Sequence, residues 1–368
     1  ASDVYKRQVK DLDSSHNTAS SSYGPGEITV VGDTLFFRGY DSTNDFALWK
    51  SDGTTAGTVM VKDTDLTNTA ERYGPNYLTA VGDTLFFRGH DAGDGYSVWK
   101  SDGTTAGTVT LSISGQSWST SNTPSITASH DGTVYFRGYD STNKYALWKS
   151  EAPHYTGSVM VKDTYTGSSS SHVYGPYGMV AVGDTIFFNG YDSTNKYTLW
   201  KSDGTATGTV MVKNIHSSAN IAQPQGPVYL TAVGDIVYFR GYDNINDYAL
   251  WKSDGTAAGT MMVKDTYPAS SSSTSFGPVY LNAVDDIVYF RGKDANGYGL
   301  WKSDGTEVGT VKIDINLNPL YDINYFSLIG DTLYFKAYEN GTNQVGLWGC
   351  STQYANLGIT AINEITYF

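Results

Sequence analysis

The sequence is poor in the residues on which several protein classes depend. It has one cysteine, Cys350, in 368 residues, which excludes an internal disulfide framework and a metal site built from cysteines. Only 24 lysines and arginines stand against 37 aspartates and glutamates, so the net charge is −13 and the basic surface of a nucleic-acid-binding protein is missing. No apolar run reaches the roughly 18–20 residues of a membrane-spanning helix. We therefore expect neither nucleic-acid binding nor membrane insertion.

Charged residues are also scarce, at 17% against a norm of about 25%. Apolar residues make up 39%, which is enough for a large core and argues against disorder. The chain is rich in glycine, with 40 residues, and in tyrosine, with 29. Its length suggests two or three domains at about 100–200 residues each, unless one β-architecture spans the whole chain.

An internal repeat dominates the sequence. The phrase Leu-Trp-Lys-Ser-Asp-Gly-Thr at 48–54 recurs with changes along the chain, and successive copies lie about 50 residues apart. The repeated tryptophans are Trp49, Trp99, Trp148, Trp200, Trp251, Trp301 and Trp348. The third copy (149–154) and the last (348–350) depart from the phrase, and we expect different turns there.

Within a unit the apolar residues alternate with a period of two, which is the strand signature. No segment shows a convincing helical period. Asp102-Gly103 is a strong hairpin signal, because glycine accepts the positive φ of such turns. In the second copy we predict strands over 77–81, 84–89, 96–100 and 108–111.

Four short antiparallel strands in each repeat of about 50 residues are typical of a β-propeller blade. We predict an all-β, seven-bladed β-propeller of four-stranded antiparallel blades as a single domain over 1–368, with the repeated tryptophans packed between adjacent blades. The predicted blades are 24–64, 74–112, 124–164, 175–215, 226–266, 277–315 and 322–368.

The ends of the chain predict how the ring closes. Residues 8–12 resemble the fourth-strand phrase at 60–64, and residues 358–362 hold the fourth-strand place of the last unit. We expect an N-terminal latch strand at about 4–13 to pair onto the last blade, because this removes an exposed sheet edge. The alternative is that this strand is the remnant of an eighth unit.

The end of the second strand offers the best candidate binding site. An aromatic ring beside an arginine and a carboxylate suits carbohydrate, since the ring stacks on sugar C–H faces and the charged groups bind hydroxyls. The alternative is a structural arginine–aspartate–lysine network within each blade, using Lys50 and its equivalents. The candidate ligand-binding residues are Arg38, Tyr40, Asp41, Arg137, Tyr139, Asp140, Arg240, Tyr242 and Asp243.

We predict no cofactor, metal site or catalytic residue. The six histidines hold scattered repeat positions without metal-ligand spacing. Calcium is the weaker alternative at two loops, although an Asx-turn explains the same composition and lysines replace the last aspartate in two other copies. The oxygen ligands would be Asp41, Asn44, Asp45, Asp243, Asn246 and Asp247.

The repeat phrase carries a resemblance to a known family. Leu-Trp-Lys-Ser-Asp-Gly-Thr-x-x-Gly-Thr, at 48–58, 199–209, 250–260 and 300–310, resembles the ELWxxDGTxxGT repeat of bacterial surface and secreted proteins. The resemblance implies a secreted, propeller-like module without enzymatic activity, often part of larger adhesive proteins. Residues 1–8 resemble a translated sequencing adaptor, so a leader that precedes them would be lost.

These observations predict a non-catalytic extracellular or cell-surface binding protein. Near-identical copies favour several equivalent weak sites over one catalytic site, which needs unlike residues. The expected partners are glycans or other cell-surface or matrix polymers, and further copies of the chain itself. The alternative is a structural subunit of an extracellular filament, sheet or surface assembly, and an enzyme ranks third.

Overall fold

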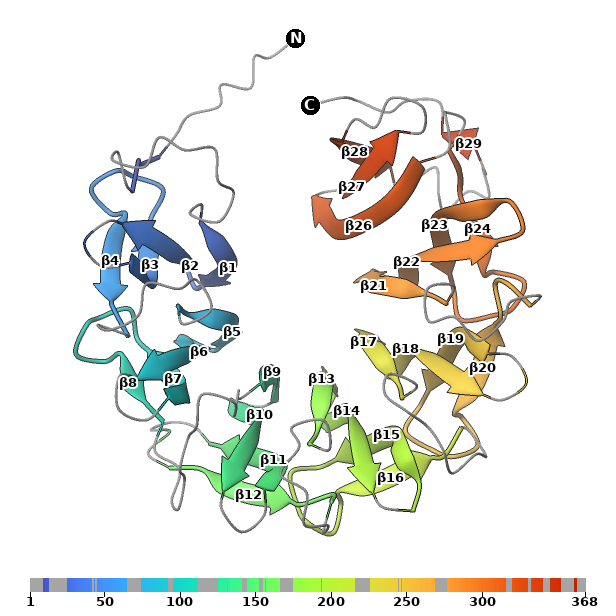
Figure 1. Ribbon diagram of the computed structural model, residues 1–368, viewed down its shortest axis with the longest axis horizontal. Coiled ribbons are helices and arrows are strands. Elements are labelled where there is room, and N and C mark those ends of the chain that lie inside the picture. The colour runs from blue at the N-terminus through green and yellow to red at the C-terminus, as the bar shows by residue number, and fades with distance from the viewer. Residues whose placement is uncertain are drawn as a thin grey trace. The chain divides into compact units, whose positions relative to one another are not determined.

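The computed structural model consists of short strands joined by turns and loops (Figure 1). It divides into two compact units, Ala1–Tyr177 and Gly178–Phe368, which we describe separately. Beyond residue 315, side-chain burial is defined only for Tyr334 and Phe335. The described residues are 9–12, 25–41, 43, 45–64, 74–91, 95–111, 125–130, 132–140, 144–151, 155, 157–165, 175–192, 194–215, 226–243, 245, 247–268, 277–315, 320–329, 332–339, 345–351 and 361–362.

The first unit contains three sheets of four antiparallel strands, each ordered as in the sequence. The first sheet is β1 (Gly26–Val31), β2 (Thr34–Asp41), β3 (Asp45–Ser51) and β4 (Val59–Lys62). The second is β5 (Asn76–Val81), β6 (Thr84–Asp91), β7 (Gly95–Ser101) and β8 (Val109–Thr110). The third is β9 (Ser125–His130), β10 (Thr133–Asp140), β11 (Lys144–Ser150) and β12 (Val159–Lys162).

The second unit continues the pattern with three more four-stranded sheets and one three-stranded sheet. These begin with β13 (Tyr177–Val182), β14 (Thr185–Asp192), β15 (Lys196–Ser202) and β16 (Val210–Lys213). Next come β17 (Val228–Val233), β18 (Ile236–Asp243), β19 (Asp247–Ser253) and β20 (Met261–Lys264), then β21 (Val279–Val284), β22 (Ile287–Asp294), β23 (Gly297–Ser303) and β24 (Val311–Lys312). The three-stranded sheet is β26 (Leu320–Ile329), β27 (Thr332–Glu339) and β28 (Val345–Ser351).

The prediction of an all-β chain built from four-stranded antiparallel sheets is confirmed for these six sheets. The part of the chain that the structure describes contains no helix long and apolar enough to cross a membrane. Each second strand pairs with both its neighbours, so the central strands bury aromatic residues on both faces.

The repeated Ser-Asp-Gly-Thr phrase builds its hairpin through side-chain hydrogen bonds. Asp52 Oδ1 accepts from both the backbone N–H and the hydroxyl of Thr54, at 2.9 and 2.7 Å. Gly53 takes φ +86°, and its N–H donates to Ser51 Oγ. The hydroxyls of Ser51 and Thr58 lie 2.7 Å apart and share a buried hydrogen bond. The same hydroxyl pair recurs as Ser101–Thr108, Ser202–Thr209, Ser253–Thr260 and Ser303–Thr310.

The repeated tryptophans pack between neighbouring sheets, as predicted. Trp99 on β7 shares a core with Val31, Phe36 and Leu48 of the preceding sheet, and stacks on Phe87 at 6.2 Å between ring centroids. This sheet thereby buries its tryptophan face against the previous one. Trp148, Trp251 and Trp301 occupy equivalent cores.

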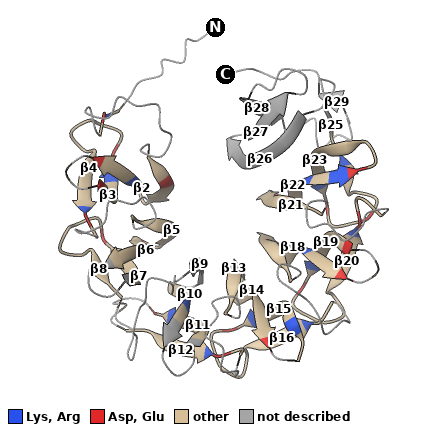
Figure 2. Ribbon diagram, in the orientation of Figure 1, with Lys and Arg blue, Asp and Glu red and all other residues tan. Residues whose placement is uncertain are grey.

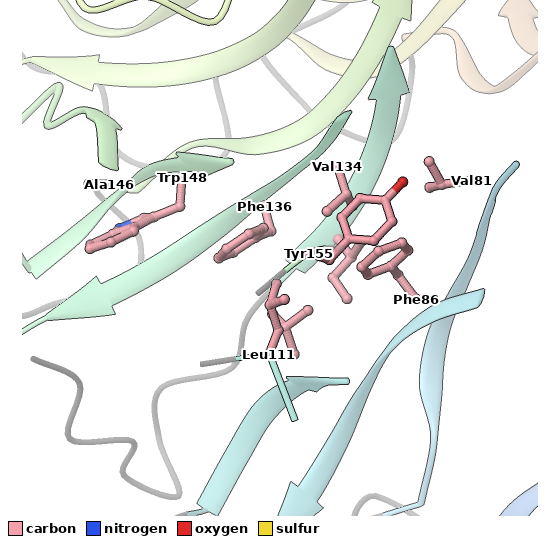
Figure 3. Packing of buried hydrophobic residues seen from close by; sticks show 10 residues of the cluster. Val81, Phe86, Leu111, Val134, Phe136, Ala146, Trp148 and Tyr155 are labelled. Atoms are coloured by element: carbon pink, nitrogen blue, oxygen red, sulfur yellow. The ribbon is translucent and has the colours of Figure 1, made fainter. Parts of the chain in front are cut away.

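In the third copy a tyrosine, Tyr155, takes the place that the turn glycine holds in the other copies. Tyr155 packs edge-on against Phe86 at 4.8 Å between ring centroids, and its hydroxyl donates to the Gly132 carbonyl at 2.6 Å (Figure 3). Its carbonyl accepts from Lys100 Nζ, as the Gly103 carbonyl accepts from Lys50 Nζ in the copy before. The prediction of a different turn here is confirmed.

Residues 9–12 contact the first sheet. Their contacts match those that the fourth strand of one sheet makes with the next sheet along the chain. Lys10 Nζ donates to the Thr58 carbonyl at 2.7 Å, and the Thr55 hydroxyl donates to the Val9 carbonyl at 2.7 Å. Leu12 packs against the core around Trp49. The same pairs recur as Lys62–Thr108, Thr105–Val61, Lys213–Thr260 and Lys264–Thr310.

The expected fourth strand of the last unit pairs elsewhere. Residues 358–362 were expected beside β28, but β29 (Ala361–Ile362) pairs in parallel with β25 (Asp314–Ile315), which follows β24. With only two paired residues, β29 carries too short an apolar pattern to specify its partner by its place in the repeat. In the described residues β26–β28 thus form a three-stranded sheet.

Candidate functional site

Of the tyrosines predicted as sugar-stacking rings, Tyr40 is buried and Tyr242 is partly buried. Tyr40 is only 8% exposed and lies against Phe46, with ring centroids 5.0 Å apart. Tyr242 lies against Tyr248 in the same way, at 5.1 Å. Burial, followed by the carboxylates of Asp247 and Asp243, raises the pKa of Tyr242. These rings therefore fill the ends of strands β2 and β18, and the side chains of Tyr139 and Asp140 lie outside the described residues.

The aspartates predicted beside those rings fix their own loops. Asp41 Oδ1 accepts from the backbone N–H of Thr43, and Asp243 Oδ1 accepts from that of Ile245, both at 2.8 Å. These are Asx-turns, which the aspartate side chain stabilises without any ligand. The alternative prediction of a network through Lys50 is also revised, since Lys50 Nζ donates to the Gly103 carbonyl of the next sheet.

The predicted arginines lie among aromatic rings. Arg38 donates from Nη1 to Asn76 Oδ1 at 2.7 Å and lies over Phe46. Arg137 lies over Tyr145 at 5.4 Å, and burial lowers the pKa of its guanidinium. Arg240 is only 6% exposed. Its guanidinium carbon lies 5.1 and 5.0 Å from two ring centroids, those of Tyr229 and Tyr248.

Sequence reasoning missed the tyrosine on the other side of these arginines. Tyr77, Tyr229 and Tyr280, which we call the first-strand tyrosines, are 47, 39 and 38% exposed. Each sits in a β-bulge of the first strand of its sheet, with φ between +55° and +58°. Each stacks on an arginine of the second strand, forming the pairs Tyr77–Arg88, Tyr229–Arg240 and Tyr280–Arg291.

One sheet of the second unit changes both members of the pair. Gly178 holds the bulge position on β13 with φ +61°, and Asn189 replaces the arginine on β14. The Asn189 amide donates to the Pro227 carbonyl at 2.8 Å. The tyrosine and the arginine occur together in three sheets and are absent together in this one, whereas the first sheet keeps Arg38 with Glu27 at the bulge, so the sequence signal for the pair is incomplete.

The acidic loops considered for calcium gather carboxylates in the fifth sheet. Asp243 and Asp247 face each other across the strand pair β18–β19. Burial, and then the charges of Asp247 and Asp243, raise the pKa of Asp265. Among the described residues no group of three or more acidic, histidine or cysteine side chains could hold a metal ion. Asn44 and Asn246 lie outside the described residues.

The second unit also contains a cavity between its first two sheets. It measures about 260 Å³, and Asp184, Lys201, Asp235 and Asp254 lie in its lining beside Phe187. Hydrogen bonds from the Thr256 hydroxyl and N–H lower the pKa of Asp254, so this carboxylate is ionised near neutral pH. Figure 2 shows basic and acidic residues interspersed along the described strands.

The comparisons with known proteins identify the fold. No family model matches the chain, and no curated protein matches it in sequence. Among solved structures it is similar to a prolyl endopeptidase (10% identity, TM-score 0.58, covering 94% of this chain and 50% of that one). It is also similar to a puromycin-hydrolysing peptidase of Mycobacterium tuberculosis (9%, 0.52, 94% and 53%) and to a puromycin hydrolase (12%, 0.50, 89% and 52%).

At these identities the likeness shows the fold, which is an all-β architecture of the β-propeller type. The chain spans about half the length of the peptidases that it matches. Our predictions of a non-catalytic carbohydrate-binding or structural protein, and of a chain that is not an enzyme, are corrected by this finding, because the matched propellers belong to hydrolases. The repeat motif determines how the hairpins are built, and it does not by itself indicate the function of the protein.

Proposed function

We propose that the chain is the propeller of a peptide hydrolase. The observation that carries the proposal is the match, over 94% of the chain, to the structure of a prolyl endopeptidase. The pair Tyr229 and Tyr280 supports it, because exposed aromatic rings held by arginines are suited to contact peptide side chains. The net charge of −13 favours neutral or cationic peptides over anionic ones.

In this proposal the residues that break the peptide bond lie outside the described side chains. His90 is the one histidine with a described side chain, and it is 5% exposed against the edge of Tyr96. A general base has to reach its proton directly or through one water, and a ring packed in this way does not. The described propeller would therefore bind and orient the substrate.

The test is to incubate the purified chain with a mixture of synthetic peptides. Cleavage is followed by mass spectrometry, and binding by ligand-observed NMR. Peptide binding supports the proposal, and cleavage would in addition place the nucleophile within this chain. A chain that neither binds nor cleaves any peptide in the mixture would overturn it.

We further infer that the sheets are the seven blades of one closed ring, with residues 9–12 in the outer-strand position of the sheet β26–β28. The support is that Lys10 and Val9 repeat the contacts that Lys62 and Val61 make with the following sheet. Secretion, which the repeat resemblance implies, also stays a proposal.

The single cysteine allows a direct test of closure. Cys350 holds on β28 the place that Ser51 holds on β3, and Lys6 precedes Val9 as Thr58 precedes Val61. Because Ser51 Oγ and Thr58 Oγ1 lie 2.7 Å apart, Lys6→Cys should form a disulfide with Cys350 inside one molecule under mild oxidation. Asp11→Cys is the control. Disulfide-linked dimers, or no disulfide, would contradict closure.

A further inference from the structure

Two first-strand tyrosines of the second unit form a pair across neighbouring sheets. Tyr229 on β17 and Tyr280 on β21 have ring centroids 5.9 Å apart and ring planes at 61°. The two strands lie side by side (Figure 1), and the Thr231 hydroxyl donates to the Leu281 carbonyl. Each ring keeps more than a third of its surface in solvent. The two rings thus meet in a tilted edge-to-face arrangement that is partly open to solvent.

The backbone at these positions does not favour tyrosine. Positive φ of this kind costs an L-residue with a side chain roughly 1–2 kcal/mol, and glycine adopts it freely. Gly178 shows the inexpensive solution at the equivalent position, where a Cβ would meet nothing within 4 Å. Tyrosine therefore occupies the bulge against the local conformational preference, so its side chain has to supply a compensating benefit.

Stacking on arginine supplies part of that benefit and also fixes the ring. The Arg240 guanidinium lies between Tyr229 and Tyr248, and that of Arg291 lies between Tyr280 and Tyr298. A bulge and a stacked guanidinium hold each exposed ring in place before any ligand arrives. Rings fixed in this way lose little conformational entropy on binding. Solvent-exposed rings that serve only to cover an arginine would not need to meet in pairs.

We propose that Tyr229 and Tyr280 form a binding site for an aromatic side chain of a peptide, and this rests on the proposed peptide-hydrolase function. A neutral ring can stack offset on one tyrosine and meet the other edge-on. A cationic group is less suited, because each tyrosine already faces a guanidinium. An anionic group is disfavoured by the net charge of −13.

The experiment compares two probes, acetyl-Gly-Phe-Gly-amide and acetyl-Gly-Ala-Gly-amide, by ligand-observed NMR on the full chain. We expect the Phe probe to bind at least tenfold more tightly than the Ala probe. The double variant Tyr229→Gly/Tyr280→Gly places at both positions the residue that the chain has at the equivalent position, Gly178. It should lose this preference. Tyr77→Gly is the matched control, because Tyr77 has the same φ and the same arginine contact but a glutamate, Glu27, at the neighbouring bulge. It should bind the Phe probe as the unaltered chain does.

Should the glycine variant fold poorly by circular dichroism, Tyr229→Asn/Tyr280→Asn replaces it, since asparagine tolerates positive φ. Equal binding of the two probes, or an unchanged preference in the double variant, would overturn the site. If the Phe probe binds but no longer peptide is bound or cleaved, the aromatic site is supported and the proposed hydrolase function is refuted. If the chain cleaves peptides and the double variant has an unchanged KM, the aromatic site is refuted and the hydrolase function is supported.

Discussion

Tyr155 gives the sharpest test of how one repeat can depart from the pattern and still fold. Its ring is 7% exposed and shares a core with Phe86, Leu111 and Val134, as Figure 3 shows. Truncating a buried aromatic ring to alanine costs about 3–5 kcal/mol, because transfer and cavity terms add. Removing only the hydroxyl deletes one hydrogen bond, to the Gly132 carbonyl, and costs about 0.5–1.5 kcal/mol. Both variants keep φ near +44°, so backbone strain cancels from the comparison.

The assay is urea unfolding followed by tryptophan fluorescence, with melting temperature as a second measure. For a cooperative unit of about 150–250 residues, 1 kcal/mol corresponds to roughly 2–4 °C. Tyr155→Phe should therefore lower the melting temperature of the first unit by about 1–6 °C, and Tyr155→Ala by at least twice as much. If alanine cost no more than phenylalanine, the ring would not be filling the space between these sheets, and our account of the third hairpin would be wrong.

The same residue predicts a dependence on alkaline pH. Burial raises the pKa of the Tyr155 phenol above its ordinary value of about 10. Above that pH the folded chain keeps a proton that the unfolded chain loses, so stability falls as the pH rises. The stabilisation is complete below pH 10. Tyr155→Phe should lose less stability between pH 9 and 11 than the unaltered chain does, when the two are compared by unfolding midpoints.

Three further predictions follow from the repeated hairpins and acidic loops. Ser253→Ala should destabilise the chain by about 1–3 kcal/mol in urea unfolding, since it removes the hydrogen bond to the buried Thr260 Oγ1, which still donates to the Thr256 carbonyl, and leaves the Gly255 N–H without this acceptor, whereas Ser253→Thr should cost less. The Thr306 hydroxyl lowers the pKa of Asp304, so the hydrogen bond stabilises the folded chain above about pH 4, and this stabilisation is lost as the pH falls through the lowered pKa. Thr306→Val should therefore weaken the acid dependence of the unfolding midpoint. An unchanged pH profile would contradict this prediction. Asp247→Lys places at this position the residue that the preceding sheet has as Lys196. It should raise stability at pH 7 by about 0.5 kcal/mol, because it relieves the repulsion that, after burial, raises the pKa of the partly hydrated Asp265. An unfolding midpoint at pH 7 that does not rise would count against this account.

The sequence was sufficient for the parts of the fold that local chemistry determines. A period of two marks the strands, and Asp52-Gly53 marks a hairpin whose turn is held by hydrogen bonds within eight residues. The tryptophan packing also followed, because a sheet repeated every 50 residues needs cover for both faces. The candidate site was harder, since Tyr40 looks like a binding residue in sequence and proves to be core, while Tyr242 is partly buried against Tyr248. Alternation within a strand does not reveal whether the neighbouring sheet covers a ring.

What local reasoning missed depends on residues far apart in the chain. Tyr229 and Arg240 lie on different strands, and the partner ring of Tyr229 belongs to another sheet, 51 residues further on at Tyr280. A bulge with positive φ at tyrosine goes against residue preference, so no propensity argument would place it there. The exchange of both residues at Gly178 and Asn189 was visible in the sequence, but Arg38 paired with Glu27 in the first sheet breaks the correlation.

The distribution of differences among the repeats bears on function more than their similarity does. Five hairpins keep the same serine, aspartate, glycine and threonine, and this uniformity first argued against a single active site. At the first-strand bulge the residues are instead Glu27, Tyr77, Gly178, Tyr229 and Tyr280, all with the same backbone conformation. A substrate that binds once needs unlike residues around it, and a repeat protein can supply them only where its copies diverge. The constant hairpins hold the sheets together, and under the proposed function the variable bulges are the positions that distinguish one peptide from another. Exchanging Gly178 for tyrosine, together with Asn189 for arginine, should therefore change which peptides bind while leaving the unfolding midpoint close to that of the unaltered chain. A change in the midpoint without a change in peptide preference would assign the bulges to folding alone.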